Sequence, residues 1–127
     1  MLSLIVASVA LLFLHIGAQA IAATSELGSA WNVGPRDAGE RPQGVVAGRA
    51  ERALRNYLET YPAFAVLAVA LVASGRADGV GLIGGGLWLA ARIVYLPLYL
   101  AGVPYWRSLV WLAAAIGLAL MAARLLV

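Results

Sequence analysis

The sequence contains no cysteine and no lysine. Without cysteine the chain can form no disulfide, no thiolate metal site and no cysteine nucleophile. Without lysine every positive side chain is an arginine, which keeps its charge even where water is scarce. The sequence also lacks a phosphate-binding glycine loop, a metal-ligand spacing and a Ser/His/Asp arrangement. We therefore expect no bound metal, and we interpret the single histidine, His15, as a packing or helix–helix hydrogen-bonding residue.

Charge is scarce and apolar residues are abundant. Only 12% of the 127 residues are charged, whereas 63% are hydrophobic, and the mean hydropathy is +0.89. A soluble domain of this length could not bury so much apolar surface, so the composition predicts an integral membrane protein. The net charge of +3 could indicate a nucleic-acid partner. The arginines are scattered along apolar segments and form no exposed stripe, so we expect no nucleic acid to bind.

Four apolar segments follow one another along the chain, at about residues 1–23, 47–74, 79–103 and 105–127. Each is long enough to cross the hydrocarbon core, which is about 30 Å thick, as a helix of about 20 residues. A polar loop at about residues 24–46 joins the first two segments, and short turns join the others. The sequence therefore predicts one all-α integral membrane domain over residues 1–127, built as a four-transmembrane-helix bundle.

The first segment has an alternative interpretation as a cleaved signal peptide, because "AQA" at Ala18–Ala20 resembles a cleavage site. No arginine precedes the apolar run, however, and the run is long for a signal peptide. We therefore favour a first helix that is retained in the membrane.

The arginines predict an orientation. The first loop and the start of the second segment carry five of them, and the turn before the fourth segment adds Arg107. The opposite side carries Arg76 and Arg124. Positive residues concentrate on the cytoplasmic side, so we expect the loop at residues 24–46 in the cytoplasm and both termini outside it.

A polar stripe opens the second segment, "RAERALRNYLETYPAF". At about 100° per residue, the stripe falls within an arc of about 120°. Such residues usually face a bundle interior or a wet cavity, and the surplus positive charge suits a ligand that carries carboxylates and an amine. The alternative is that the arginines only pair with neighbouring helices or extend to the membrane interface. The stripe consists of Arg49, Arg52, Arg55, Asn56 and Glu59.

Arg92 lies deep inside the third segment, which is otherwise uncharged over its apolar span. A lone arginine at this depth is a functional-site candidate. Tyr95 and Tyr99 fall within about 60° of Arg92 on the same helical face, although an aromatic belt at the interface would also explain them. Pro97 should free the carbonyl of Ile93 and bend the helix. We interpret the glycines of this segment as sites of close helix packing: Gly81, Gly84, Gly85 and Gly86.

Arg107 opens the fourth segment, directly after "PYW". It could be an ordinary anchor at the cytoplasmic interface. It could equally be a cation at the mouth of the same polar cavity, where it would stabilise an anion such as a thiolate.

These residues together resemble the MAPEG family, the membrane-associated proteins in eicosanoid and glutathione metabolism. The second-segment signature of that family is matched by Arg52, Asn56, Glu59 and Pro62. Its later arrangement of an arginine, a tyrosine and a further arginine is matched by Arg92, Tyr99 and Arg107, and Tyr95 falls where some members carry a tyrosine. The resemblance extends over the length, the four spans, the long first loop and the short second turn. The first loop, "WNVGPRD", looks more like that of prokaryotic members.

The resemblance implies a homotrimer that binds glutathione between adjacent subunits, near the cytoplasmic side. Arginines would take the carboxylates of glutathione and the acidic residue its amine. Arg107 would be the catalytic residue that lowers the thiol pKa, so that the thiolate attacks a lipophilic electrophile or reduces a lipid hydroperoxide. In a bacterial inner membrane both termini would be periplasmic. The residues that would bind glutathione, as a co-substrate, are Arg52, Asn56, Glu59, Arg92, Tyr95 and Tyr99.

Some features depart from the glutathione-using members, which often carry basic residues after the first helix and an aromatic residue where this chain has Thr60. Val94 likewise stands where some members have a polar or aromatic residue. A MAPEG-fold membrane protein without catalysis is therefore an alternative. A small four-helix exporter is a weaker one, because such exporters use a glutamate in the first helix and no acidic residue here precedes Glu26. One four-helix bundle of this size has little room to bury Arg52, Asn56, Glu59 and Arg92 together with a ligand, which also favours a trimer whose polar stripe faces a subunit interface.

Overall fold

The structure is a computed structural model of residues 1–127, and it is entirely helical. Four of its five helices are long and apolar enough to cross a membrane. The fifth, α2, is a short helix in the first loop. The helices are α1 (Leu2–Leu27), α2 (Ser29–Val33), α3 (Val45–Ala73), α4 (Gly79–Ala101) and α5 (Trp106–Leu126).

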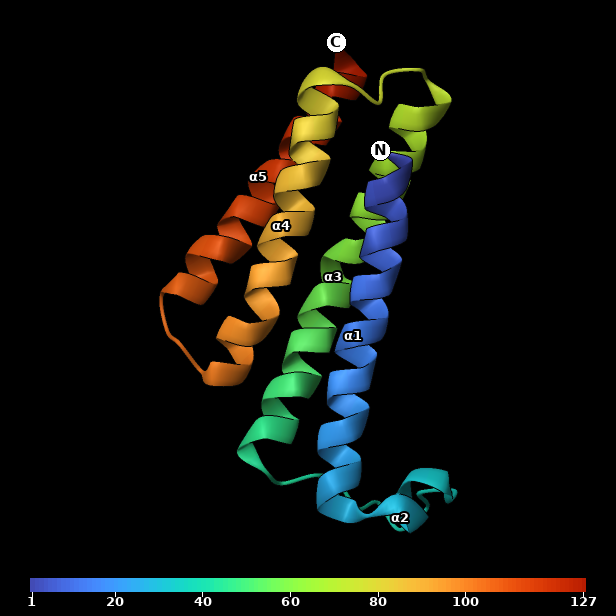
Figure 1. Ribbon diagram of the computed structural model, residues 1–127, viewed down its shortest axis with the longest axis vertical. Coiled ribbons are helices and arrows are strands. Elements are labelled where there is room, and N and C mark those ends of the chain that lie inside the picture. Colours follow the sequence, from blue (N-terminus) through green and yellow to red (C-terminus); the bar gives the residue numbers. More distant parts are fainter.

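The four long helices run alongside one another, with α1 next to α3 and α4 next to α5 (Figure 1). Both termini and the turn between α3 and α4 lie at one end of the molecule. The loop that carries α2 and the turn between α4 and α5 lie at the other end, which we call the loop end. The two connections that sequence analysis assigns to one side of the membrane therefore lie together.

The helix bounds differ from the hydropathy pattern mainly at the first loop. α1 extends to Leu27, four residues beyond the predicted span, and α2 forms inside a segment that we expected to be loop. Polar residues end the apolar run without ending the helix, which continues until Gly28. Gly28 adopts a φ of 86°, a left-handed value that glycine accepts readily, and its N–H donates to the carbonyl of Thr24 at 2.8 Å.

Glu26 joins the two ends of the first loop. Its carboxylate accepts hydrogen bonds from the backbone N–H of Gln43 at 2.5 Å and of Gly44 at 2.9 Å, at the start of α3. A carboxylate is favourable at this position because the first N–H groups of a helix lack partners within the helix. The loop is thus closed at its base, where α3 begins.

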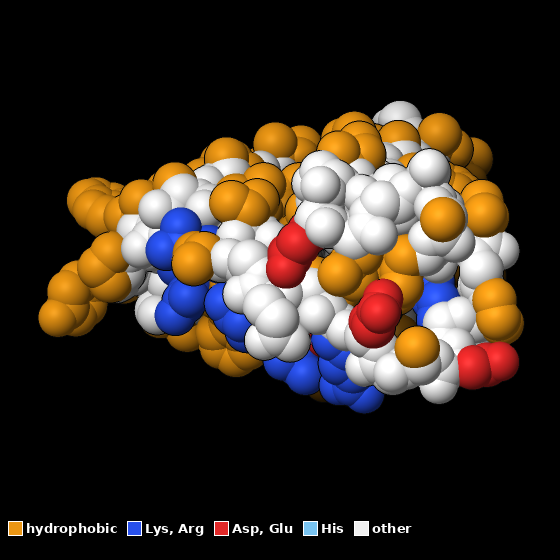
Figure 2. Space-filling model, turned by 90° about the horizontal axis from the view of Figure 1, so that it is seen from below, with side chains coloured by type: hydrophobic (Ala, Val, Ile, Leu, Met, Phe, Trp, Pro, Cys, Tyr) orange, Lys and Arg blue, Asp and Glu red, His pale blue; other side chains and the backbone are white.

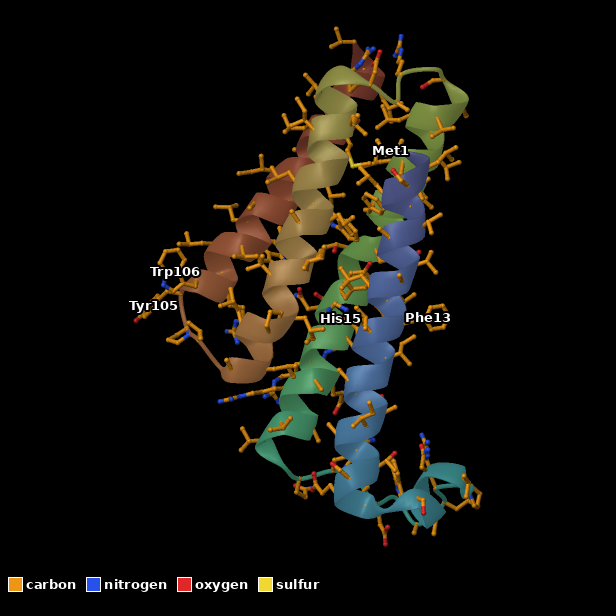
Figure 3. All side chains as sticks on the ribbon, in the orientation of Figure 1. Met1, Phe13, His15, Tyr105 and Trp106 are labelled. Carbon is orange, nitrogen blue, oxygen red and sulfur yellow. The ribbon has the colours of Figure 1, made fainter.

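An aromatic cluster fills the interior between α1, α3 and α4. Phe64 stacks on Trp88 with ring centroids 4.0 Å apart, and Tyr57 lies 5.6 Å from Trp88. The Tyr57 hydroxyl donates to the carbonyl of Ser8 at 2.7 Å. His15 packs 4.5 Å from the Tyr57 ring, and its Nδ1 lies 2.9 Å from the carbonyl of Leu11. Figure 3 shows His15 pointing into the bundle, so its position agrees with the packing interpretation.

α4 and α5 make the most extensive helix contact, and two glycines bring their backbones together. A Cβ added at Gly84 would lie only 2.6 Å from the carbonyl oxygen of Gly117. Gly86 has no atom within 4 Å of such a Cβ, so the close-packing interpretation is wrong for Gly86 within this subunit. Both prolines within helices, Pro62 and Pro97, are exposed, and α3 and α4 continue through them.

Candidate functional site

Arg92 is the centre of the polar site, and α4 places it almost completely out of contact with solvent, at 1% exposure. Its Nη1 donates to Asn56 Oδ1 at 2.8 Å, and its Nη2 donates to Thr60 Oγ1 at 2.7 Å. Both acceptors lie on α3, one helical turn apart. No carboxylate pairs with the guanidinium, so its charge is stabilised by neutral oxygens and by the ring face of Tyr95, whose centroid is 5.4 Å away.

A second polar contact extends from this arginine toward the surface. The Asn56 amide accepts from Arg92 through its oxygen and donates through Nδ2 to Glu59 Oε2 at 3.2 Å. Because both ends of the amide are engaged, its orientation is fixed. Glu59 itself is exposed. The result is a chain of hydrogen bonds from a buried cation to a carboxylate on the outside of α3.

A cavity of about 260 Å³ adjoins this network at the loop end. The Arg107 guanidinium lies over the ring of Tyr99, 4.7 Å from its centroid, and the rings of Tyr95 and Tyr99 are 5.4 Å apart. Arg107 forms no ion pair, so its charge is available to an anion in the cavity. The cavity is lined by residues from three helices: Asn56 of α3, Tyr95 and Tyr99 of α4, and Arg107, Ser108 and Trp111 of α5.

The structure brings most of the sequence-predicted site residues to one place. Four of them line the cavity, and Arg92 and Glu59 are bonded to Asn56. Arg52 is the exception, because it is exposed and forms no ion pair within the chain. A single chain buries Arg92 by itself. Arg52 and Glu59, by contrast, stay on its surface.

The polar stripe of α3 also divides into two parts. Arg49 donates through Nη1 to the carbonyl of Leu100 at 2.9 Å, near the end of α4. The last carbonyls of a helix lack partners within the helix, and a cation there also offsets the helix dipole. Arg49 therefore links α3 to α4, whereas Arg52 and Arg55 point to the exterior.

Three contributing residues were not identified from the sequence. Thr60 lies four residues after Asn56, and Trp111 lies four residues after Arg107, so helical periodicity alone could have placed each on its neighbour's face. Ser108 follows Arg107 directly and also lines the cavity. The departure at Thr60 from the aromatic residue of some MAPEG members has a local reason, since its hydroxyl holds Arg92.

A larger cavity, of about 540 Å³, lies at the opposite end, between the start of α1 and the turn after α3. The only ion pair of the chain is close by, where Arg124 Nη2 and Asp78 Oδ1 are 3.0 Å apart. Arg76 donates to the carbonyl of Leu125 at 2.7 Å and so holds the end of α5. None of the predicted site residues lies there. The smaller cavity, with its unpaired cation and two tyrosines, is the better candidate site despite its size.

Comparison with protein families gives one match, to the model of the MAPEG family, over residues 4–127. Comparisons with curated proteins and with solved structures found no match. The matched region includes α3, α4 and α5, all of α1 except its first two residues, and every residue of the candidate site. The residues whose spacing resembles the family, among them Arg52, Asn56 and Arg92, all lie within the matched region. The chain belongs to the MAPEG family.

Proposed function

We propose that the protein is a glutathione-dependent membrane transferase or peroxidase. Many members of the family are enzymes of this kind. The observation that carries the proposal is the position of Arg107, an arginine without a carboxylate partner in a cavity that it shares with Asn56, Tyr95 and Tyr99. A cation in a cavity that two tyrosines also line suits a small anion, and a thiolate is the anion that transferase and peroxidase chemistry requires.

The surrounding groups match the charges of glutathione, which carries two carboxylates and one amine. Arg92 keeps donors for a carboxylate, because each Nη carries two N–H groups and uses only one toward α3. Its Nε is buried and has no partner. Arg52 would take a carboxylate from the exposed side, and Glu59 would take the amine.

The shape of the site supports a second subunit as part of it. The cavity of about 260 Å³ is smaller than the range of about 300–1,000 Å³ typical of sites for drug-sized ligands. A tripeptide would extend beyond it toward Arg52 and Glu59, which lie on the outside of α3. In a homotrimer, a neighbouring copy would cover that surface and complete the site. We propose that the trimer is the functional unit for this reason.

Arg107 would act by lowering the pKa of the glutathione thiol, which is ordinarily about 8.5. Tyr95 or Tyr99 would donate a hydrogen bond to the same sulfur. In transfer, the thiolate forms a C–S bond with an electrophilic carbon and the leaving group departs with its electron pair. In peroxide reduction, the thiolate attacks the terminal oxygen of the O–O bond and becomes a sulfenic acid, and the alkoxide that leaves takes up the proton released by the thiol to form the alcohol. A second glutathione then converts the sulfenic acid to glutathione disulfide and water.

The site lies at the loop end, where six of the nine arginines are located in the first loop and at the starts of α3 and α5. Figure 2, a view toward this end, shows arginine side chains gathered on it. By the positive-inside rule we propose that this end faces the cytoplasm of a bacterial inner membrane, with both termini in the periplasm.

Calorimetric titration of the detergent-purified protein with glutathione tests the proposed binding. Arg52→Ala and Glu59→Gln should each weaken binding about 30-fold or more, because each removes one partner of a charge-assisted pair. Arg41→Ala is the matched control, an exposed arginine of the first loop away from the cavity, and should bind like the wild type. If both Arg52→Ala and Glu59→Gln bind glutathione with wild-type affinity, Arg52 and Glu59 do not bind the ligand and have only a structural role. A wild type that binds no glutathione would favour a family member without this activity.

A further inference from the structure

The turn between α4 and α5 has an unusual backbone, and it leads directly to Arg107. Tyr105 adopts φ 60° and ψ −59°, and the N–H of Trp106 donates to the carbonyl of Pro104 at 2.7 Å. This is a γ-turn of the rare, strained kind, with a positive φ at its central residue. The conformation is unfavourable for a residue with a side chain, so it persists only where the surrounding structure fixes it.

The side chains of the turn do not supply that support. Tyr105 is 83% exposed and Trp106 is 64% exposed, and Figure 3 shows both pointing away from the bundle. The close backbone contact of α4 with α5 at Gly84 is also distant, about 25 Å along the helix axis from the end of α4. The turn is therefore held at its two ends, where α4 stops and where α5 starts.

Arg49 fixes the end of α4. The chain itself satisfies two of the last carbonyls of this helix, through the N–H groups of Gly102 and Val103. The next carbonyl, that of Leu100, accepts from Arg49 Nη1 at 2.9 Å. Gly102 has a φ of 73°, and a Cβ added to it would overlap the Arg49 guanidinium. Arg49 therefore lies directly against the backbone at which the turn begins.

The same bond bears on the cavity of the candidate site. Leu100 follows Tyr99 directly, and the Arg107 guanidinium lies over the Tyr99 ring. Arg49 thus fixes the backbone beside Tyr99, and the turn that starts there carries Arg107. Arg49 does not line the cavity, so its influence on the site passes through these two residues.

We infer that Arg49 is a positioning residue, which holds the end of α4 and the strained turn so that Arg107 stays over Tyr99 in the cavity. The inference rests on the proposed function for the chemistry of Arg107, and not for the conformation of the turn. Two other roles are separated from it by experiment. Arg49 could bind a carboxylate of glutathione itself, or it could add stability without any effect on Arg107.

Arg76 provides a matched control for the second of these roles. It also donates to a carbonyl near the end of a helix, that of Leu125 at 2.7 Å. This bond lies at the opposite end of the molecule, beside the termini (Figure 1). Arg76→Leu therefore removes the same kind of interaction as Arg49→Leu, far from the α4–α5 turn.

The first arm of the test measures amide hydrogen exchange in the protein without glutathione. In Arg49→Leu, the amides of residues 101–108 should exchange about 10-fold faster or more, because a hydrogen bond from a charged donor is lost. Arg49→Lys keeps a charged donor and should recover most of the protection, and Arg76→Leu should leave these amides unchanged. Wild-type exchange rates there in Arg49→Leu, or equal acceleration in Arg76→Leu, overturn the inference whatever the protein does with glutathione.

Gly102→Ala tests the same contact even if Arg49→Leu does not fold, because the new Cβ would displace the guanidinium. Gly75→Ala is its control, since Gly75 has a φ of 69° and no atom within 4 Å of an added Cβ. Both variants bear the cost of a positive φ, and only Gly102→Ala also displaces Arg49. The Tm of Gly102→Ala should therefore fall clearly below that of Gly75→Ala. Equal Tm values would show that Arg49 is not held against the turn, and would overturn the inference.

The second arm follows the thiol of bound glutathione by ultraviolet difference absorbance across pH. Arg49→Leu should bind glutathione nearly as well as the wild type, while its thiol titration shifts toward the pKa of about 8.5 of a free thiol. Arg49→Lys should reverse most of the shift, and Arg76→Leu should show none. Weaker binding with an unshifted titration would make Arg49 a ligand-binding residue and overturn the inference. A wild type that binds no glutathione, or binds it without a thiolate, contradicts the proposed function instead, and the first arm then decides the inference alone.

Discussion

At the scale of single residues, the central feature is a buried arginine without an ion pair. A charge inside a membrane span is costly unless it finds partners. Arg92 has two neutral oxygens from α3 and the ring of Tyr95. Because these partners do not neutralise the charge, the guanidinium can still attract a carboxylate. The same contacts join α3 to α4, so the residue that would bind ligand also contributes to helix association.

Thr60→Val tests this arrangement. Valine keeps the shape of threonine but removes the oxygen that accepts from Arg92 Nη2, so a buried charged donor loses its partner. We expect a cost of about 1–3 kcal/mol and a lower Tm in detergent. Thr60→Ser should recover most of the stability, because it keeps the hydroxyl. Thr24→Val is the matched control, since no side-chain hydrogen bond from Thr24 is present, and should be neutral. A Thr60→Val protein as stable as the wild type would mean that Arg92 does not depend on this contact.

At the scale of helices, the contact between α4 and α5 sets the geometry of the cavity, because α4 supplies both tyrosines and α5 supplies Arg107. The contact depends on the absence of a side chain at Gly84 and Gly117. Two other glycines of α4 do not touch α5: a Cβ added at Gly85 would meet Leu4 and Met1, and one added at Gly86 would meet no atom within 4 Å.

Gly84→Ala should therefore force α4 and α5 apart, since the new Cβ would meet a backbone carbonyl that cannot turn away. We expect a Tm clearly below that of the wild type and weaker glutathione binding. Gly86→Ala provides the comparison on the same helix, where the added methyl meets no atom and alanine favours the helix by about 0.5–1 kcal/mol. Equal effects of the two substitutions on Tm would show that this contact does not determine the packing.

The long helices could be predicted because lipid requires continuous apolar runs, and such runs are visible in a single sequence. Their ends at the first loop could not, because Thr24, Ser25 and Glu26 are polar enough to leave the lipid yet remain helical. Within each helix, periodicity correctly grouped Asn56 with Glu59 and Tyr95 with Tyr99. Contacts between helices depend on their relative register, which no single helix encodes. The bond from Arg92 to Thr60 and the bond from Arg49 to Leu100 were therefore not foreseen.

At the scale of the whole molecule, the proposed trimer gives a direct prediction. Arg52 and Glu59 are exposed on one chain, and the cavity next to them is small for a tripeptide. We expect the mass in a mild detergent to be three times the chain mass of 13.2 kDa. A stable monomer that still binds glutathione would contradict a site completed by a second copy.

The proposed orientation is tested separately, because it depends on the arginine distribution and not on assembly. A reporter fused after Val127 that is active only in the periplasm should be active, and the complementary cytoplasmic reporter should be silent. The same reporter fused within the first loop should give the reverse result. A cytoplasmic C-terminus would place the candidate site on the opposite side of the membrane.

The measurement that tests the account most directly is the ultraviolet difference absorbance of the bound glutathione across pH. A free thiol with a pKa of about 8.5 is only a few per cent thiolate at pH 7. If Arg107 stabilises the anion, the wild-type complex should show thiolate absorbance well below pH 8. Arg107→Leu should bind glutathione and lack that absorbance, along with most of the turnover. A wild-type complex with no thiolate below pH 8, or an Arg107→Leu complex that keeps it, would contradict the catalytic role assigned to this arginine.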